Sequence, residues 1–122
     1  MMRILVVEDE ELVRNLLRAA LEDLGYNVVE ARNGLEGLAV YRQTAVGLVI
    51  ADLEMPEMDG LTMIKTLHGE QAYVPVIAIS GTPEKFSDIQ RFGVRYTFQK
   101  PFCLQELLST VHTLVGGQIQ AQ

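Results

Sequence analysis

The chain alternates short apolar runs with longer segments in which apolar residues recur every three or four positions. The short runs are rich in apolar and β-branched residues, which is typical of strands. Three of them (the first, third and fourth) show no polar alternation, as expected for strands buried on both faces of a parallel sheet. The five predicted strands are 3–7 (RILVV), 27–31 (NVVEA), 47–51 (GLVIA), 76–80 (VIAIS) and 96–99 (YTFQ).

The segments between the strands have helical periodicity. Apolar residues from Leu12 to Leu24 recur at three- and four-residue steps, which predicts a helix with one apolar stripe that ends at Gly25. The other four helices are predicted over residues 34–43, after the turn Asp59–Gly60, after Thr82 as N-cap with Pro83 as first helical residue, and from Leu104 to the pair Gly116–Gly117.

Five strand–helix units indicate the α/β class, with a doubly wound five-stranded parallel sheet and helices on both of its faces. A chain of 122 residues has room for one such domain and no second core. We expect the domain to comprise residues 1–117 and residues 118–122 to be a flexible tail or linker stub. In sheets of this class the functional site lies beyond the carboxyl ends of the strands.

Composition and charge exclude several classes of function. With 48% hydrophobic and 21% charged residues, the chain is expected to fold. Its net charge is −6 and its ten lysines and arginines are scattered, which argues against binding nucleic acid or a membrane surface. A single cysteine excludes an internal disulfide and a CxxC metal site. No apolar run approaches the ~18 residues of a membrane span and no signal-peptide pattern is present, so we expect a cytoplasmic protein.

Ionisable and hydroxyl side chains stand at the carboxyl ends of the predicted strands. Glu8 and Asp9 follow the first strand and Asp52 follows the third, while Ser80 ends the fourth and Lys100 follows the fifth. Because parallel strands end at one edge of the sheet, we expect these groups to converge. Clustered carboxylates repel one another unless a cation lies among them, and hard oxygen ligands suit Mg²⁺. Asp52 is placed as a carboxylate nucleophile that forms an aspartyl-phosphate.

Four segments, VVEDE, IADLEMPEMDG, VIAISG and QKPF, carry a family resemblance between about Arg3 and Val115. In this order and spacing they resemble the signature segments of response-regulator receiver domains, the chemotaxis-regulator-like domains of two-component signalling. The resemblance implies a flavodoxin-like fold with strand order 2-1-3-4-5. It also implies that Asp52 accepts a phosphoryl group from a phosphohistidine of a sensor histidine kinase or a histidine phosphotransfer protein. Such a domain is a switch and not a dedicated turnover enzyme.

The resemblance assigns ligands to a metal ion. Asp9 and Asp52 would bind Mg²⁺ directly and Glu8 would help through water. The backbone carbonyl of Glu54 would complete the ligands from the protein, with Mn²⁺ as the alternative ion.

The resemblance also assigns roles around the phosphoryl group. Ser80 would follow that group after transfer, Lys100 would pair with one of its oxygens, and Gly81 would leave its entry open. Thr82 and Glu54 each lie two residues past a site residue, where the family tunes the lifetime of the phosphate. Pro101 is the candidate cis-proline.

The sequence departs from the family pattern in three places. Glu8 stands where many members have Asp. Thr97 stands where the family usually has the aromatic residue that rotates during switching, and strand alternation puts Tyr96 and Phe98 on the opposite face. The segment between Ser80 and Lys100 is short, which predicts a trimmed fourth helix or a trimmed loop before that helix. The downstream partner is expected to bind the face formed by the fourth helix, fifth strand and fifth helix.

Three other functions compete with the switch. A constitutive, unphosphorylated interaction module is kept open by Thr97. An aspartate-nucleophile phosphatase is kept open by Glu54, which has the spacing of a general acid after Asp52, although no cap domain is visible. A flavin mononucleotide carrier would need a phosphate-binding loop after the first strand, where EDEE repels phosphate. Whether the receiver acts alone, as a relay intermediate or within a longer protein stays open.

Overall fold

The computed structural model describes the backbone of residues 3–120 and the side chains of residues 3–115. Every strand pairing is parallel. The sheet has the order β2-β1-β3-β4-β5, which confirms the order implied by the resemblance. The strands are β1 (Arg3–Val7), β2 (Asn27–Ala31), β3 (Leu48–Asp52), β4 (Val76–Ser80) and β5 (Tyr96–Gln99).

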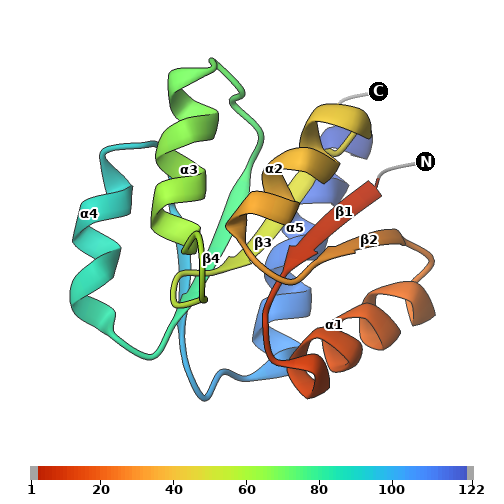
Figure 1. The fold of residues 1–122 in the computed structure, drawn as a ribbon. Coiled ribbons are helices and arrows are strands. Elements are labelled where there is room, and N and C mark those ends of the chain that lie inside the picture. The colour runs from red at the N-terminus through yellow and green to blue at the C-terminus, as the bar shows by residue number, and fades with distance from the viewer. Residues whose placement is uncertain (1–2, 121–122) are drawn as a thin grey trace.

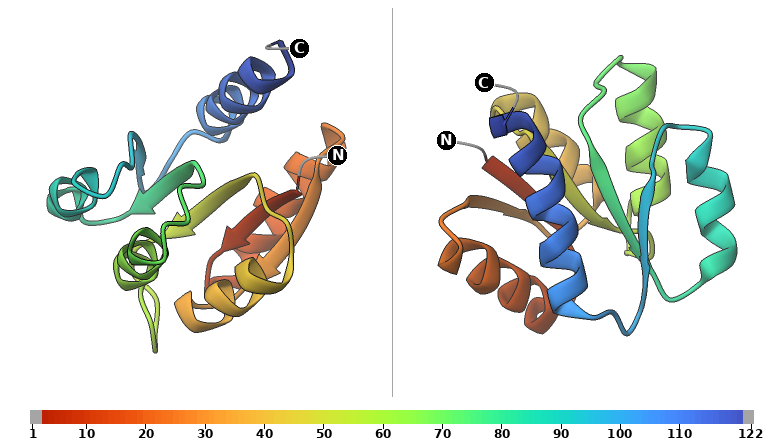
Figure 2. Two further views of the ribbon diagram at one scale, coloured as in Figure 1. Left: turned by 90° about the horizontal axis from the view of Figure 1, so that it is seen from above. Right: turned by 180° about the vertical axis from the view of Figure 1, so that it is seen from behind.

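Helices cover both faces of the sheet, as Figures 1 and 2 show. Helices α2, α3 and α4 pack on one face and α1 and α5 pack on the other. The bounds of the helical elements are α1 (Glu11–Asp23), α2 (Gly34–Gln43), α3 (Gly60–Gly69), the 3₁₀ turn η1 (Pro83–Lys85), α4 (Phe86–Gln90) and α5 (Leu104–Gln120).

The core consists of two apolar layers, one on each face of the sheet. Along β1, Leu5 and Val7 belong to the layer under α2 and α3, whereas Ile4 and Val6 belong to the layer under α1 and α5. Both faces of the strand are therefore buried, and this is why the apolar runs of the central strands show no polar alternation.

Local sequence signals set several helix ends. Asn33 and Asp59 cap α2 and α3 by accepting hydrogen bonds from the backbone N–H groups of Glu36 and Thr62. Gly25 follows α1 with a φ of +93°, a left-handed conformation that glycine adopts without strain. Of the two changes expected between Ser80 and Lys100, the structure has the short fourth helix: η1 precedes a five-residue α4. Within the described residues, no helix is long and apolar enough to cross a membrane.

One sequence prediction about the helices was wrong. The fifth helix does not end at Gly116–Gly117 but continues to Gln120. A glycine inside a helix costs about 1 kcal/mol but keeps its backbone donor, so it weakens a helix without ending it. The predicted stripe of α1 is only partly buried, because Leu12 is 85% exposed while Leu17 and Leu21 face the core. Residues 121–122 of the expected tail lie outside the described residues.

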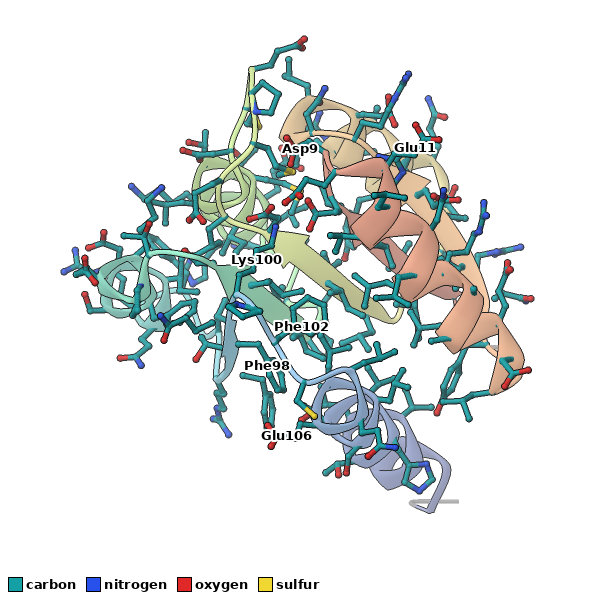
Figure 3. The ribbon with its side chains drawn as sticks, turned by 90° about the horizontal axis from the view of Figure 1, so that it is seen from below. Asp9, Glu11, Phe98, Lys100, Phe102 and Glu106 are labelled. Atoms are coloured by element: carbon teal, nitrogen blue, oxygen red, sulfur yellow. The ribbon has the colours of Figure 1, made fainter. Side chains whose placement is uncertain are left out.

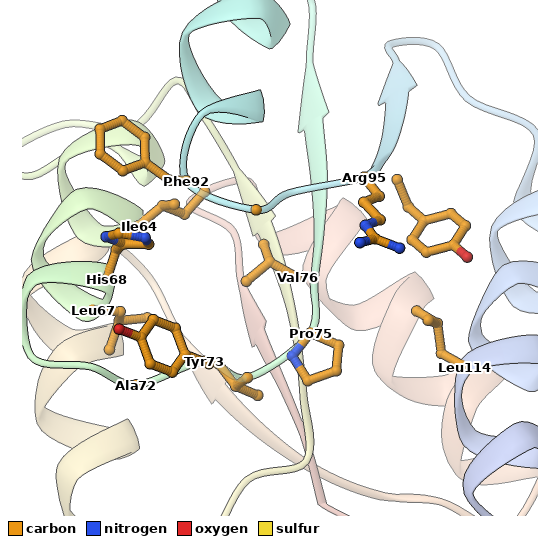
Figure 4. Close-up of a pocket in the computed structure, with 13 residues that line it drawn as sticks. Ile64, Leu67, His68, Ala72, Tyr73, Pro75, Val76, Phe92, Arg95 and Leu114 are labelled. Atoms are coloured by element: carbon orange, nitrogen blue, oxygen red, sulfur yellow. The ribbon is translucent and has the colours of Figure 1, made fainter.

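A cavity of about 290 Å³ lies at the opposite end of the sheet from the predicted site (Figure 4). His68, Tyr73 and Phe92 line one side of it, and Arg95 and Leu114 line the other. His68 packs edge to face against both aromatic rings. None of the residues predicted to carry chemistry lines this cavity.

Candidate functional site

The carboxyl ends of four strands bring the predicted groups to one edge of the sheet. Asp52 is the last residue of β3 and Ser80 the last of β4, while Glu8 directly follows β1. All three are buried, at 3%, 0% and 1% exposure. Lys100 directly follows β5, and Figure 3 shows it over the ends of the strands. Buried ionisable groups need partners, and here the partners come from neighbouring strands.

Lys100 is the cation at the centre of this edge. Its Nζ lies 2.8 Å from Asp52 Oδ2, 2.9 Å from Glu10 Oε1 and 3.2 Å from Glu8 Oε1. Burial alone would lower the pKa of Lys100, but hydrogen bonds to Asp52 and Glu10 outweigh that effect and raise the pKa. The ammonium therefore stays charged and offsets part of the negative charge of the three carboxylates.

Lys100 offsets the negative charge of the Glu8 carboxylate only in part. Its Oε2 accepts a hydrogen bond from the Glu10 backbone N–H at 3.1 Å, but its Oε1 accepts none within the described part of the chain. Burial and the negative charge of Asp52 raise the pKa of Glu8 to about 8. One carboxylate oxygen each from Glu8, Glu10 and Asp52 lie within 4.8 Å of one another. A buried oxygen that accepts no hydrogen bond, although Lys100 Nζ lies 3.2 Å away, in a group of three carboxylates fits a divalent cation such as Mg²⁺.

The structure does not bring Asp9 into this carboxylate group. Asp9 is exposed, and its backbone carbonyl is 3.5 Å from the guanidinium of Arg14. Glu10, which sequence reasoning missed, joins the group instead. The signal was available, because alternate residues of an extended segment point to the same side, and the backbone of Glu10 is extended. Glu8 and Glu10 therefore share a side that Asp9 does not.

Glu54 connects the phosphoacceptor candidate to the end of β4. Its backbone N–H donates to Asp52 Oδ1 at 2.9 Å. Its carboxylate accepts hydrogen bonds from the Ser80 hydroxyl and, at 2.9 Å, from the Gly81 N–H, and it lies 3.4 Å from Lys85 Nζ. Burial would raise the pKa of Glu54, but the two hydrogen bonds and the ion pair outweigh it and lower the pKa. The carboxylate is therefore ionised at neutral pH.

Two glycines shape the backbone around these groups. A Cβ on Gly60 would lie 2.2 Å from the carbonyl oxygen of Asp52, so α3 begins in direct contact with the end of β3. Sequence reasoning missed this role of Gly60, since no pattern reveals a contact across the seven residues that separate β3 from α3. A Cβ on Gly81 would meet only Glu54 Oε1, at 3.9 Å, so the backbone there is open.

The remaining predicted residues surround the ends of β4 and β5. The Thr82 N–H donates to Ser80 Oγ at 2.9 Å. The peptide bond between Lys100 and Pro101 is cis. Thr97 pairs with Ala78, whereas Phe98 packs in the layer under α5. Thr97 occupies the position in β5 where the resemblance implies an aromatic residue.

Comparisons with known proteins agree with this geometry. The sequence matches the family model of the response regulator receiver domain over residues 4–112. The polar-differentiation response regulator DivK of Brucella anthropi is 32% identical over 117 residues, covering 93% of this chain and 95% of that protein.

Two solved structures show the same likeness. Chemotaxis protein CheY4 of Vibrio cholerae is 28% identical with a TM-score of 0.85, covering 93% of this chain and 98% of that one. Response regulator TrrA of Thermotoga maritima, in complex with Mg(2+)-BeF, is 32% identical with a TM-score of 0.84, covering 93% and 99%.

Proposed function

Because the chain belongs to the response regulator receiver domain family of two-component systems, we propose that it is a switch whose Asp52 accepts a phosphoryl group. One observation carries the proposal: the Asp52 carboxylate is oriented by two donors. Lys100 Nζ holds Oδ2 at 2.8 Å and the Glu54 N–H holds Oδ1 at 2.9 Å. A carboxylate fixed in this way beside a cation is preorganised as a nucleophile.

In the proposed reaction the phosphoryl donor is a phosphohistidine of a histidine kinase or a histidine phosphotransfer protein. A carboxylate oxygen of Asp52 forms a bond to phosphorus, the phosphorus–nitrogen bond breaks, and its electron pair returns to the imidazole of the donor. Lys100 then pairs with an oxygen of the transferred group and the Ser80 hydroxyl donates to another. Gly81 leaves the approach open because it has no side chain.

The acidic group fits a bound Mg²⁺, which would offset the negative charge of the carboxylates and of the incoming phosphoryl oxygens. Glu8, Glu10 and Asp52 are the side chains that the geometry offers for it. The resemblance adds Asp9 and the Glu54 backbone carbonyl, with Mn²⁺ as the alternative ion. The Oε1 of Glu8, which is buried and accepts no hydrogen bond within the described residues, supports this part of the proposal.

A hollow of about 400 Å³ beside Lys100 supports the approach of a protein donor. Val13, Leu16 and Phe102 line it, and Leu16 is 51% exposed. A donor protein that docks over this hollow would meet these apolar side chains beside Lys100, so its own surface there would be apolar. After transfer, the face formed by α4, β5 and α5 would bind the downstream partner.

In this proposal residues 1–117 are the receiver domain, residues 118–122 are a tail or linker, and the protein works in the cytoplasm. The phosphatase alternative loses support, because the lowered pKa of Glu54 leaves it without the proton that a general acid would donate.

The test is phosphorylation by a small phosphodonor, such as phosphoramidate, followed by intact mass measurement. We expect one phosphoryl adduct with Mg²⁺, far less with chelator, and none for Asp52→Asn. Glu57→Gln, which removes an exposed charge from the same loop, is the matched control and should behave as the wild type. No adduct on the wild type under any condition would contradict the proposal and favour the constitutive interaction module.

A further inference from the structure

The Glu54 carboxylate engages two donors at the end of β4 at once. Ser80 Oγ–H donates to Glu54 Oε2, and the Gly81 N–H donates to Oε1 at 2.9 Å. These two donors belong to consecutive residues, so the carboxylate bridges them. Charge-assisted hydrogen bonds of this kind are about twice as strong as neutral ones.

In the proposed reaction the Ser80 hydroxyl donates to a phosphoryl oxygen, and the Gly81 N–H belongs to the next residue of the chain, beside that hydroxyl. Phosphoryl oxygens and a carboxylate are both anionic acceptors, and each N–H or O–H group carries a single proton. Glu54 and the phosphoryl group would also repel each other if they shared the site. While the Glu54 carboxylate accepts hydrogen bonds from the Ser80 hydroxyl and the Gly81 N–H, phosphoryl oxygens therefore cannot accept them.

Lys85 gives Glu54 a link to the start of the fourth helix. Its Nζ lies 3.4 Å from Glu54 Oε2, and Lys85 is the last residue of η1, which leads directly into α4. The Thr82 carbonyl, at the start of η1, lies 3.1 Å from Ser80 Oγ and is a second acceptor beside the same hydroxyl. A displaced Glu54 would therefore change contacts at both ends of η1.

We propose that Glu54 is an internal competitor of the phosphoryl group: in the unphosphorylated chain its carboxylate occupies Ser80 and Gly81, and phosphorylation of Asp52 displaces it. This inference rests on the proposed function. The displacement carries the signal to η1 and α4 through Lys85, along a route that needs no aromatic residue in β5. Thr97 stands at the position in β5 where the family usually has an aromatic residue. The route through Glu54 and Lys85 would therefore replace that residue in coupling the phosphorylation site to η1 and α4.

The experiment compares the wild type with Glu54→Ala, Glu54→Gln and the control Glu57→Ala, a loss of the same charge from an exposed position of the same loop. Beryllium trifluoride in excess Mg²⁺ serves as the phosphoryl analogue, and the backbone amide signals of Gly81 and Thr82 report binding by NMR. We expect Glu54→Ala to bind the analogue about tenfold more tightly, because a charge-assisted hydrogen bond no longer has to be broken. Glu54→Gln should fall between, and Glu57→Ala should match the wild type.

A double-mutant cycle tests the role of Lys85. Lys85→Ala should change the analogue affinity of the wild type but leave that of Glu54→Ala unchanged, since Lys85 acts through Glu54. The Gly81 amide signal should also move in Glu54→Ala before any analogue is added.

Unchanged or weaker binding by Glu54→Ala, with a wild type that binds normally, would overturn the inference and leave the proposed function intact. A wild type that takes up neither the analogue nor a phosphoryl group would overturn the proposed function and the inference with it.

Discussion

Replacing Gly60 by alanine should destabilise the protein and shift the backbone of Asp52. The added Cβ would lie 2.2 Å from the Asp52 carbonyl oxygen and 3.0 Å from both the Asp52 carbonyl carbon and Leu53 Cα. All three are backbone atoms, so no side chain can rotate away, and α3 must shift relative to β3. Overpacking of this kind costs about 1–3 kcal/mol, and the rigid contact argues for the upper end, about 3 kcal/mol.

Gly69, the last residue of the same helix, provides the matched control. A Cβ there would meet no atom within 4 Å. Gly69→Ala should therefore stabilise the protein by about 0.5 kcal/mol through helix propensity. Urea unfolding measures both variants, and with a slope of about 2 kcal/mol per molar the midpoint of Gly60→Ala should fall by about 1.5 M. A Gly60→Ala midpoint equal to that of the wild type, or an equal loss in Gly69→Ala, would refute the reasoning.

Two further predictions concern the charges at the strand ends. Lys100→Met should lower the free energy of unfolding by about 2 kcal/mol in chelator at pH 7. Removing one partner of a buried ion pair costs about 3–5 kcal/mol. The expected loss is smaller here because the Lys100 side chain is 22% exposed and its charge is partly screened by solvent. Urea curves unchanged within about 0.5 kcal/mol would contradict it. In metal-free protein, burial and the negative charge of Asp52 raise the pKa of Glu8 from its ordinary value of 4.5 to about 8, so the unfolded chain loses this proton at lower pH than the folded one. The free energy of unfolding should therefore fall as pH rises from about 5 to 8, and Glu8→Gln should make this fall smaller. Equal slopes in the wild type and in Glu8→Gln would contradict the burial of a Glu8 whose charge is only partly offset.

Much of the fold follows from short-range patterns. The central strands were predicted because both of their faces are covered, which removes polar alternation. Helix ends were predicted where a residue has a specific role, as with Asp59 at the start of α3. The end of α5 was not, because glycine weakens a helix without removing a backbone donor. The exposed leucines of α1 were not predicted either, since periodicity defines a stripe but not how wide a strip the sheet covers.

The site was predicted only as far as strand order determines it. The sequence places Asp52, Ser80 and Lys100 at strand ends, and parallel pairing brings those ends together. Glu10 lies in the carboxylate group and the predicted Asp9 does not, because of the local backbone conformation after β1. The sequence pattern does not determine that conformation. The contacts of Glu54 depend on the course of the loop after β3, which no periodicity describes.

The central claim is that the phosphoryl group is carried by Asp52 and by no neighbouring acid. The most direct test is to phosphorylate the protein with a small phosphodonor in Mg²⁺, reduce it with borohydride, and sequence its peptides by mass spectrometry. Reduction converts an aspartyl-phosphate to homoserine and so marks the residue that carried the group. We expect homoserine at position 52 alone. A reduced residue at Glu8, Asp9 or Glu54, or no reduced residue in a protein that takes up phosphate, would contradict it.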